Sequence, residues 1–199
     1  LALIHSREGN LDKAEYHCRE ALKYKPDYID PMNVLGLLLA HKGEFEEARS
    51  LMFQFLETCE HLKTEGDYNL LILNKLGSDY EVYYTLGEIE FKESNFEKAQ
   101  EYLEKSLDSN EYYWRPYALL ASMALETQNW ESAAVAGEAG ITCAFLNAEK
   151  YGSLGAQHSE FRDMLQNYQT ALTECAKSSN RIEGLDDALA SIDELLDKK

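Results

Sequence analysis

Residues 32–56, MNVLGLLLAHKGEFEEARSLMFQFL, decide the fold of this chain. Leu35 and Gly36 lie in a first apolar segment, and HKGE at 41–44 is a turn signal. After the turn, apolar residues recur at spacings of three and four, which predicts an amphipathic helix: Phe45, Ala48, Met52, Phe55 and Leu56. Neither helix can bury its apolar stripe alone. The stretch therefore predicts two helices folded back on each other.

The same pattern recurs along the chain with a period of 34 residues. Five of its positions have a counterpart 34 residues earlier: Gly9, Leu11, Ala14, Cys18 and Leu22. Four have a counterpart 51 residues later, which is one period plus an insert of 17: Leu86, Gly87, Phe96 and Ala99. A further step of 34 from Leu86, Phe96, Ala99 and Leu107 leads to Leu120, Trp130, Ala133 and Ile141. Four copies therefore share one template, as in repeat proteins.

Small residues occupy positions where two helices must approach closely. Gly36 and Ala48 let backbones come near in the second copy, and Gly87 and Ala99 do so in the third. A large residue three positions before the alanine fills the space behind each contact: Phe45, Phe96 and Trp130. We expect a bulky side chain at Ala99 to overpack this contact.

These residues and their period resemble the tetratricopeptide repeat (TPR) family. The family pattern joins Leu-Gly in a first helix, a glycine or polar turn, an aromatic residue three before a small alanine, and a late proline. It is matched here by Leu35-Gly36, Gly43, Phe45, Ala48 and Pro26. Three positions depart from it: Ser94 at the turn, Ala121 at the helix glycine and Phe145 at the proline. The resemblance covers roughly residues 1–147 and implies an all-α fold, a right-handed superhelical solenoid of antiparallel helix-turn-helix hairpins.

We expect one solenoid over residues 1–199, in which each unit contacts only its neighbours. The expected repeats are 1–28, 29–62, 80–113 and 114–147, with an insert at 63–79, a loop at 148–158 and a degenerate capping hairpin at 159–197. The first repeat is truncated within its first helix. The chain is therefore expected to be a piece of a longer protein, in which a targeting signal would lie outside it.

Two segments each have two interpretations. The insert is too apolar between Leu70 and Leu76 for a solvated loop, so we expect a short helical turn packed on the edge of the solenoid. The alternative is a plug that occupies the groove or contacts a partner. The connector EYYWRPY at 111–117 either seals adjacent repeats or forms a binding hot spot, and Tyr117, one period after Tyr83, favours packing.

The chain carries a net charge of −17. Such a charge repels phosphates, which argues against nucleic acid and anionic membranes as partners. No apolar run approaches the ~18 residues of a membrane span, so no membrane insertion is expected. The charges keep an elongated molecule in solution, or part of their field attracts a basic partner.

No catalytic or cofactor motif is present in the sequence. A Gly-rich phosphate loop, HExxH and GxSxG are all absent, so we expect no enzyme activity and no cofactor. The four cysteines form no CxxC pair, which fits a reducing compartment and a cytoplasmic location: Cys18, Cys59, Cys143 and Cys175. Cys18 aligns with Met52 and Leu103 and is expected in the core. Near neighbours on a helix do not face one point, so no metal site is expected.

The predicted function is therefore protein binding. The resemblance implies that the first helix of each hairpin lines a concave groove, which holds an extended or helical segment of another protein. Projecting the stripe opposite the packed one gives the candidate partner-binding residues Asn33, Leu37, His41, Tyr84, Glu88, Lys92, Arg115, Ser122 and Glu126. The alternative for each is plain solvated helix surface.

Other roles stay open. Chaperone-binding members of the family grip a C-terminal carboxylate with asparagines and lysines, and Asn33 matches one of them. Leu37, Tyr84 and Glu88 stand where further amide or basic groups would be needed, so we do not expect a heat-shock chaperone docking module. An assembly module that self-associates, or a regulatory TPR arm of a larger enzyme, are the alternatives to an adaptor.

Overall fold

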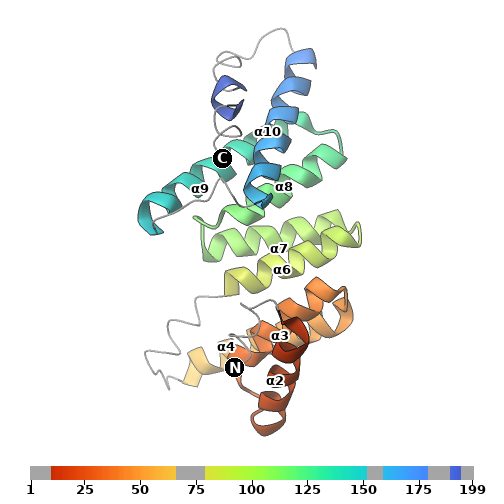
Figure 1. Ribbon diagram of the computed structural model, residues 1–199, viewed down its shortest axis with the longest axis vertical. Coiled ribbons are helices and arrows are strands. Elements are labelled where there is room, and N and C mark those ends of the chain that lie inside the picture. The colour runs from red at the N-terminus through yellow and green to blue at the C-terminus, as the bar shows by residue number, and fades with distance from the viewer. Residues whose placement is uncertain (1–9, 66–78, 152–158, 179–188, 194–199) are drawn as a thin grey trace. The chain divides into compact units, whose positions relative to one another are not determined.

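The computed structural model describes residues 10–65, 79–151, 159–178 and 189–193. These residues are helical apart from a few turn residues, and no strand occurs among them, which confirms the predicted all-α class (Figure 1). The chain divides into two compact units, residues 1–93 and 94–199. The expectation of a single solenoid stays a prediction, and each unit is described by itself.

The first unit contains four described helices: α2 (Leu11–Tyr24), α3 (Ile29–Lys42), α4 (Phe45–Glu65) and α6 (Asp79–Lys92). Asn10 caps α2, because its side-chain oxygen accepts a hydrogen bond from the Lys13 amide at 3.4 Å. Gly43 ends α3 with a left-handed φ of 82°, and its N–H bonds the carbonyls of Ala40 and Leu39. Only a residue without Cβ adopts this backbone at no steric cost.

Helix α3 is the centre of the first unit. It packs against α2, α4 and α6, so most of its surface is buried, including Met32, Leu35 and Leu39. A Cβ atom added at Gly36 would lie 3.2 Å from Cγ of Met52 on α4. The close approach predicted for this position is therefore confirmed.

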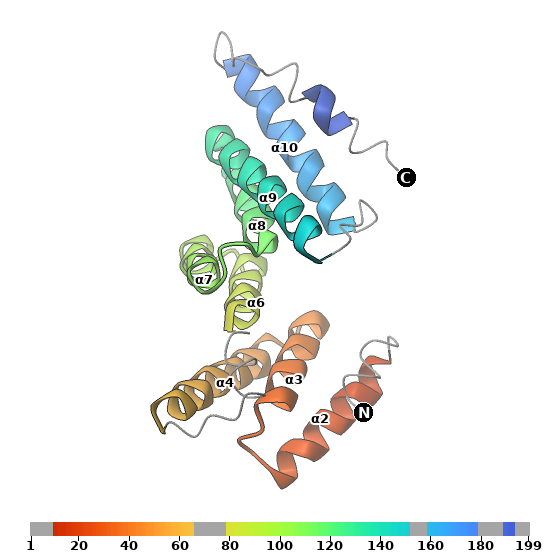
Figure 2. The same ribbon diagram turned by 90° about the vertical axis from the view of Figure 1, so that its left-hand side faces the viewer.

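The second unit contains α7 (Phe96–Ser109), α8 (Trp114–Glu126), α9 (Trp130–Tyr151) and α10 (Ser159–Ser178), followed by helical residues 189–193. Helix α10 packs against both α8 and α9, as Figure 2 shows. A core cluster joins them: Ala144, Phe161, Met164, Leu165, Leu172 and Ile192. The ring of Trp114 meets Phe161 edge-to-face at 6.1 Å, so this part of the aromatic connector seals helices together.

The boundaries correct some expectations. Residues 148–151, expected in a loop, are the last turn of α9, because good helix formers such as Ala148, Glu149 and Lys150 precede Gly152. Residues 63–65, expected in the insert, are the end of α4. Residues 1–9, 66–78, 152–158, 179–188 and 194–199 lie outside the described residues, and with them the helical turn expected between Leu70 and Leu76.

The fourth copy fills its core differently from the others. Gly137 stands one period after Leu103, which is fully buried. A Cβ atom at Gly137 would lie 2.8 Å from Cβ of Tyr168 on α10. One turn further along α9, a Cβ atom at Gly140 would meet the Met164 sulfur at 2.6 Å. The side chains of α10 therefore occupy the space that a large residue of α9 would take.

Candidate partner-binding surfaces

The three predicted residues on α3 lie on its least buried face. Asn33 and Leu37 are half-buried, and His41 is exposed. The Asn33 side-chain oxygen is buried and accepts no hydrogen bond from a described residue. Leaving a buried acceptor unsatisfied costs about 1–3 kcal/mol, so this atom calls for an explanation.

The three predicted residues on α6 are also accessible in part. Tyr84 and Glu88 are half-buried, and Lys92 is exposed. The Lys92 ammonium pairs with the Glu88 carboxylate at 2.9 Å, one helical turn away. Because α6 packs against α3 and α4, these residues belong to the same unit as Asn33. We name the six residues the first-helix surface: Asn33, Leu37, His41, Tyr84, Glu88 and Lys92.

The three predicted residues on α8 lie in the second unit and have different surroundings. The Arg115 guanidinium lies over the Trp114 ring, 6.0 Å from its centroid. The Ser122 hydroxyl donates to the Ala118 carbonyl at 3.0 Å and accepts from the Asn167 amide of α10 at 3.0 Å. Glu126 is exposed. Ser122 thus takes part in the contact between α8 and α10.

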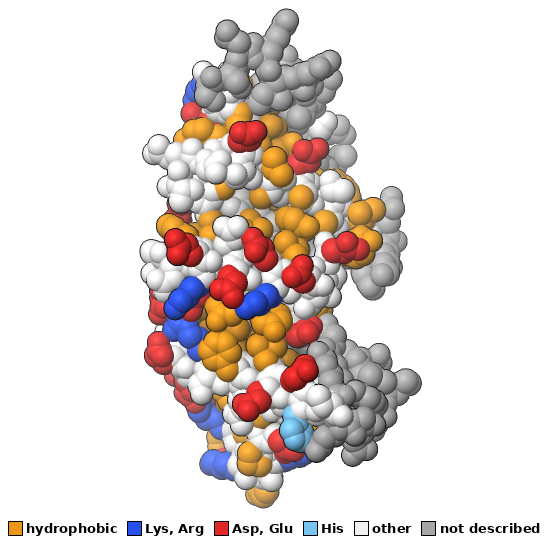
Figure 3. All heavy atoms as spheres, turned by 180° about the vertical axis from the view of Figure 1, so that it is seen from behind, with side chains coloured by type: hydrophobic (Ala, Val, Ile, Leu, Met, Phe, Trp, Pro, Cys, Tyr) orange, Lys and Arg blue, Asp and Glu red, His pale blue; other side chains and the backbone are white. Residues whose placement is uncertain are grey.

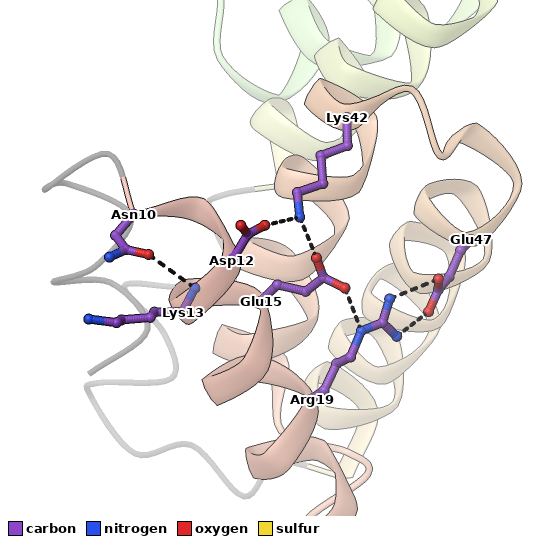
Figure 4. A network of polar contacts seen from close by, with 7 residues as sticks. All are labelled: Asn10, Asp12, Lys13, Glu15, Arg19, Lys42 and Glu47. Carbon is purple, nitrogen blue, oxygen red and sulfur yellow. Dashed lines mark hydrogen bonds and ion pairs between the residues drawn. The ribbon is translucent and has the colours of Figure 1, made fainter.

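An ion-pair network joins α2, α3 and α4 (Figure 4). The Lys42 ammonium donates to Asp12 at 2.8 Å and to Glu15 at 2.7 Å. Arg19 donates to Glu15 at 2.7 Å and to both carboxylate oxygens of Glu47 at 2.6 and 3.0 Å. The hydrogen bond from Lys42 is the largest cause of a lowered pKa of Glu15, and the hydrogen bond from Arg19 is the second; together they hold this pKa below its ordinary 4.5. These charges hold helices together.

A second cluster joins α4 to α6 through Arg49. Its guanidinium donates to Glu90 at 3.0 Å, to Glu46 at 2.9 Å and to Glu93. Burial works against the charge of Arg49, but the hydrogen bonds with Glu93 and Glu90 leave its pKa raised. Glu90 is 5% exposed and stands 51 residues after Leu39, a core position of the template. A carboxylate at a core position is the sequence signal that could have revealed this pair.

The second unit also contains a cleft that sequence reasoning missed. It has a volume of about 650 Å³ and lies between α7, α8 and α9. Its floor contains Leu120, Met123 and Ala124, and Val135 and Ala139 line one wall. None of the nine predicted residues lines this cleft. The helical periodicity of one segment could not reveal it, because the cleft depends on the packing of three segments.

In the part of the chain that the structure describes, no group of three or more His, Cys, Asp or Glu side chains is arranged to hold a metal ion. Over the same residues, no helix has the length and apolar character that crossing a membrane requires. Cys18 is fully buried, and the burial raises the pKa of its thiol to about 11. Its predicted place in the core is confirmed.

Comparison with known proteins supports the repeat interpretation. Residues 80–113 match the tetratricopeptide repeat family, with the same bounds as the third predicted copy. A crystal structure of MamA resembles the fold with a TM-score of 0.60 and 18% identity, covering 98% of this chain and 85% of that one. A second MamA crystal structure gives a TM-score of 0.56 at 18% identity and covers 91% and 98%. A comparison with curated proteins gives no match.

The chain is therefore an all-α protein with a tetratricopeptide-like fold. Within it, residues 80–113 are a tetratricopeptide repeat, a class of repeat known as a protein-interaction module. At 18% identity the likeness to MamA concerns the fold alone.

Proposed function

We propose that the chain is a non-catalytic adaptor that holds a segment of a partner protein on the first-helix surface. The observation that carries this proposal is the buried, unsatisfied oxygen of Asn33. A backbone or side-chain N–H of a bound segment would satisfy this acceptor once the surrounding side chains adjust. The cost of leaving it unpaired would then be recovered on binding.

The composition of the surface supports the proposal. Leu37 and Tyr84 offer half-buried apolar groups, while Glu88 and Lys92 already pair with each other. A segment held here would gain apolar contact at the centre and meet polar groups around it, as in protein interfaces generally. In the second unit, Arg115 and Glu126 stay candidate contacts on α8 by themselves, and Ser122 contacts Asn167.

The charge of the chain favours a basic partner. Figure 3 shows acidic side chains scattered over one face of the molecule, among hydrophobic ones. At a net charge of −17, a segment rich in lysine or arginine would be attracted and steered to the surface.

A displayed library of random peptides, selected on the immobilised chain, supplies ligands for the test. Binding of a selected, labelled peptide is then measured by fluorescence anisotropy. We expect the Tyr84→Ala, Lys92→Ala double variant to weaken binding about tenfold and to keep its helicity in circular dichroism. Gln54→Ala changes an exposed residue of α4 outside the surface and should leave the affinity unchanged.

Asn33→Ala separates a binding asparagine from a structural one. Because the Asn33 oxygen has no partner among the described residues, its removal should cost little stability but weaken peptide binding. Unchanged peptide affinity in both the Asn33 and the double variant would show that the first-helix surface is not the binding site. Light scattering across a concentration series would then test self-association.

A further inference from the structure

The cleft between α7, α8 and α9 is a concave feature of the second unit. Its volume of about 650 Å³ falls in the range of roughly 300–1,000 Å³ that is typical of ligand sites. It shares no residue with the first-helix surface. Any role for it therefore goes beyond the function proposed above.

The lining of the cleft is more apolar than a solvated helix face needs to be. Val135 is 64% exposed, and Leu120 and Ala124 are exposed in part. On α9 the residues facing the cleft recur at helical spacing and carry no charge between Ser132 and Ala139. Covering such a stripe with another apolar surface lowers the free energy.

The charged groups at the cleft are of one sign. Glu97 in the first turn of α7 and Glu131 in the first turn of α9 both line it, and both are exposed. No lysine or arginine is among the residues that line it. An occupant with positive charge beside its apolar side would therefore complement the cleft.

The length of the cleft indicates the form of the occupant. Along α8 and its C-cap residue the lining extends from Tyr117 to Thr127, about 15 Å at the helical rise of 1.5 Å per residue. That length matches two to three turns of a helix whose apolar side chains recur at spacings of three and four. A second copy of this chain is a poor occupant, because the chain has a net charge of −17 and would repel another copy of itself.

We propose that the cleft between α7, α8 and α9 binds an amphipathic helix of a partner protein. The aliphatic side chains of that helix enter the cleft over Leu120 and Val135. Its lysine or arginine side chains face Glu97 and Glu131. The chain thereby has a second protein-binding surface, and this one is selective for basic amphipathic helices.

A synthetic 14-residue helix is the probe, with leucines at positions 4, 7, 8 and 11 and lysines among the other positions. A matched peptide carries glutamate in place of each lysine. Both are titrated into the full chain carrying ¹³C-labelled methyl groups, and methyl spectra are recorded. We expect saturable shifts at Leu120, Met123 and Val135 with the lysine peptide, and none with the glutamate peptide.

Charge reversal separates the cleft from the general attraction between a basic peptide and an acidic protein. Glu97→Lys, Glu131→Lys should weaken binding of the lysine peptide about tenfold. Asp108→Lys, Glu138→Lys makes the same change in net charge at exposed sites of α7 and α9 outside the cleft, and should have a much smaller effect. Equal losses in the two variants, shifts at methyl groups away from the cleft, or titrations without saturation would overturn the proposal.

Discussion

Replacing Gly137 with leucine tests how the fourth copy fills its core. The repeat template places Leu103 and Met52 at the corresponding positions, so the sequence pattern alone would accept a leucine. In the structure, a Cβ atom at Gly137 would already lie 2.8 Å from Cβ of Tyr168. That Tyr168 atom is fixed to the backbone of α10 and cannot rotate away, so α10 must move.

The expected loss follows from two opposing contributions. Overpacking a core costs about 1–3 kcal/mol. A leucine adds three carbons beyond the clashing Cβ of position 137, so we expect a cost near the upper end of this range. The higher helix propensity of leucine than of glycine returns about 0.8 kcal/mol. We therefore expect Gly137→Leu to destabilise the second unit by about 1–2 kcal/mol. Leucine at the exposed Thr142 of the same helix should cost nothing measurable.

Urea unfolding followed by tryptophan fluorescence isolates the effect. Both tryptophans, Trp114 and Trp130, lie in the unit formed by residues 94–199. Tyr168→Ala should also destabilise this unit, because it removes a packed ring. In the double variant the Cβ atom of residue 168 remains, but the Cγ and Cδ2 atoms, which would lie 3.0 and 2.8 Å from a Cβ at position 137, are gone. The leucine then fills part of the space left by the ring, so the loss should be smaller than the sum of the single losses by about 1 kcal/mol. Additive losses, or a Gly137→Leu chain as stable as the wild type, would refute the reasoning.

Three further outcomes are expected. Hydrogen bonding from Lys42 lowers the pKa of Glu15, so the ionised Glu15 carboxylate stabilises the fold fully above pH 4.5. This stabilisation is lost as the pH falls through the lowered pKa. Unfolding followed by circular dichroism should therefore show that the stability difference between wild type and Glu15→Gln shrinks in acid. Gly43→Ala should cost about 1 kcal/mol at its φ of 82°, and Gln128→Gly, at a φ of 57°, should raise the melting temperature. Cys18, with a thiol pKa of about 11, should stay unmodified by iodoacetamide at pH 8 until the chain unfolds, as read by mass spectrometry.

The repeat template predicted where helices begin. Its large positions, Phe45, Phe96 and Trp130, are the first residues of α4, α7 and α9. They could be read from the sequence because each lies at a fixed distance from a turn that ends the preceding helix. The turn keeps its left-handed backbone even where glycine is replaced, with φ of 63° at Ser94 and 57° at Gln128. Local periodicity is therefore sufficient to predict where these repeat helices begin.

Contacts between distant segments could not be predicted in the same way. The pairing of Glu90 with Arg49 joins residues 41 apart in sequence, and Tyr168 reaches Gly137 from a helix outside the repeat register. The cleft of the second unit likewise depends on how three helices pack. A periodic pattern states which face of a helix is buried, but it does not state which side chain of another helix covers it.

Site-specific photocrosslinking tests the proposed adaptor role most directly. A benzoylphenylalanine at Leu37, on the first-helix surface, is compared with one at the exposed Gln54 of α4, using the selected peptide as partner. The proposal predicts a crosslinked peptide from position 37 and none from position 54. Crosslinking at 54 alone, or at both positions with equal yield, would contradict the account.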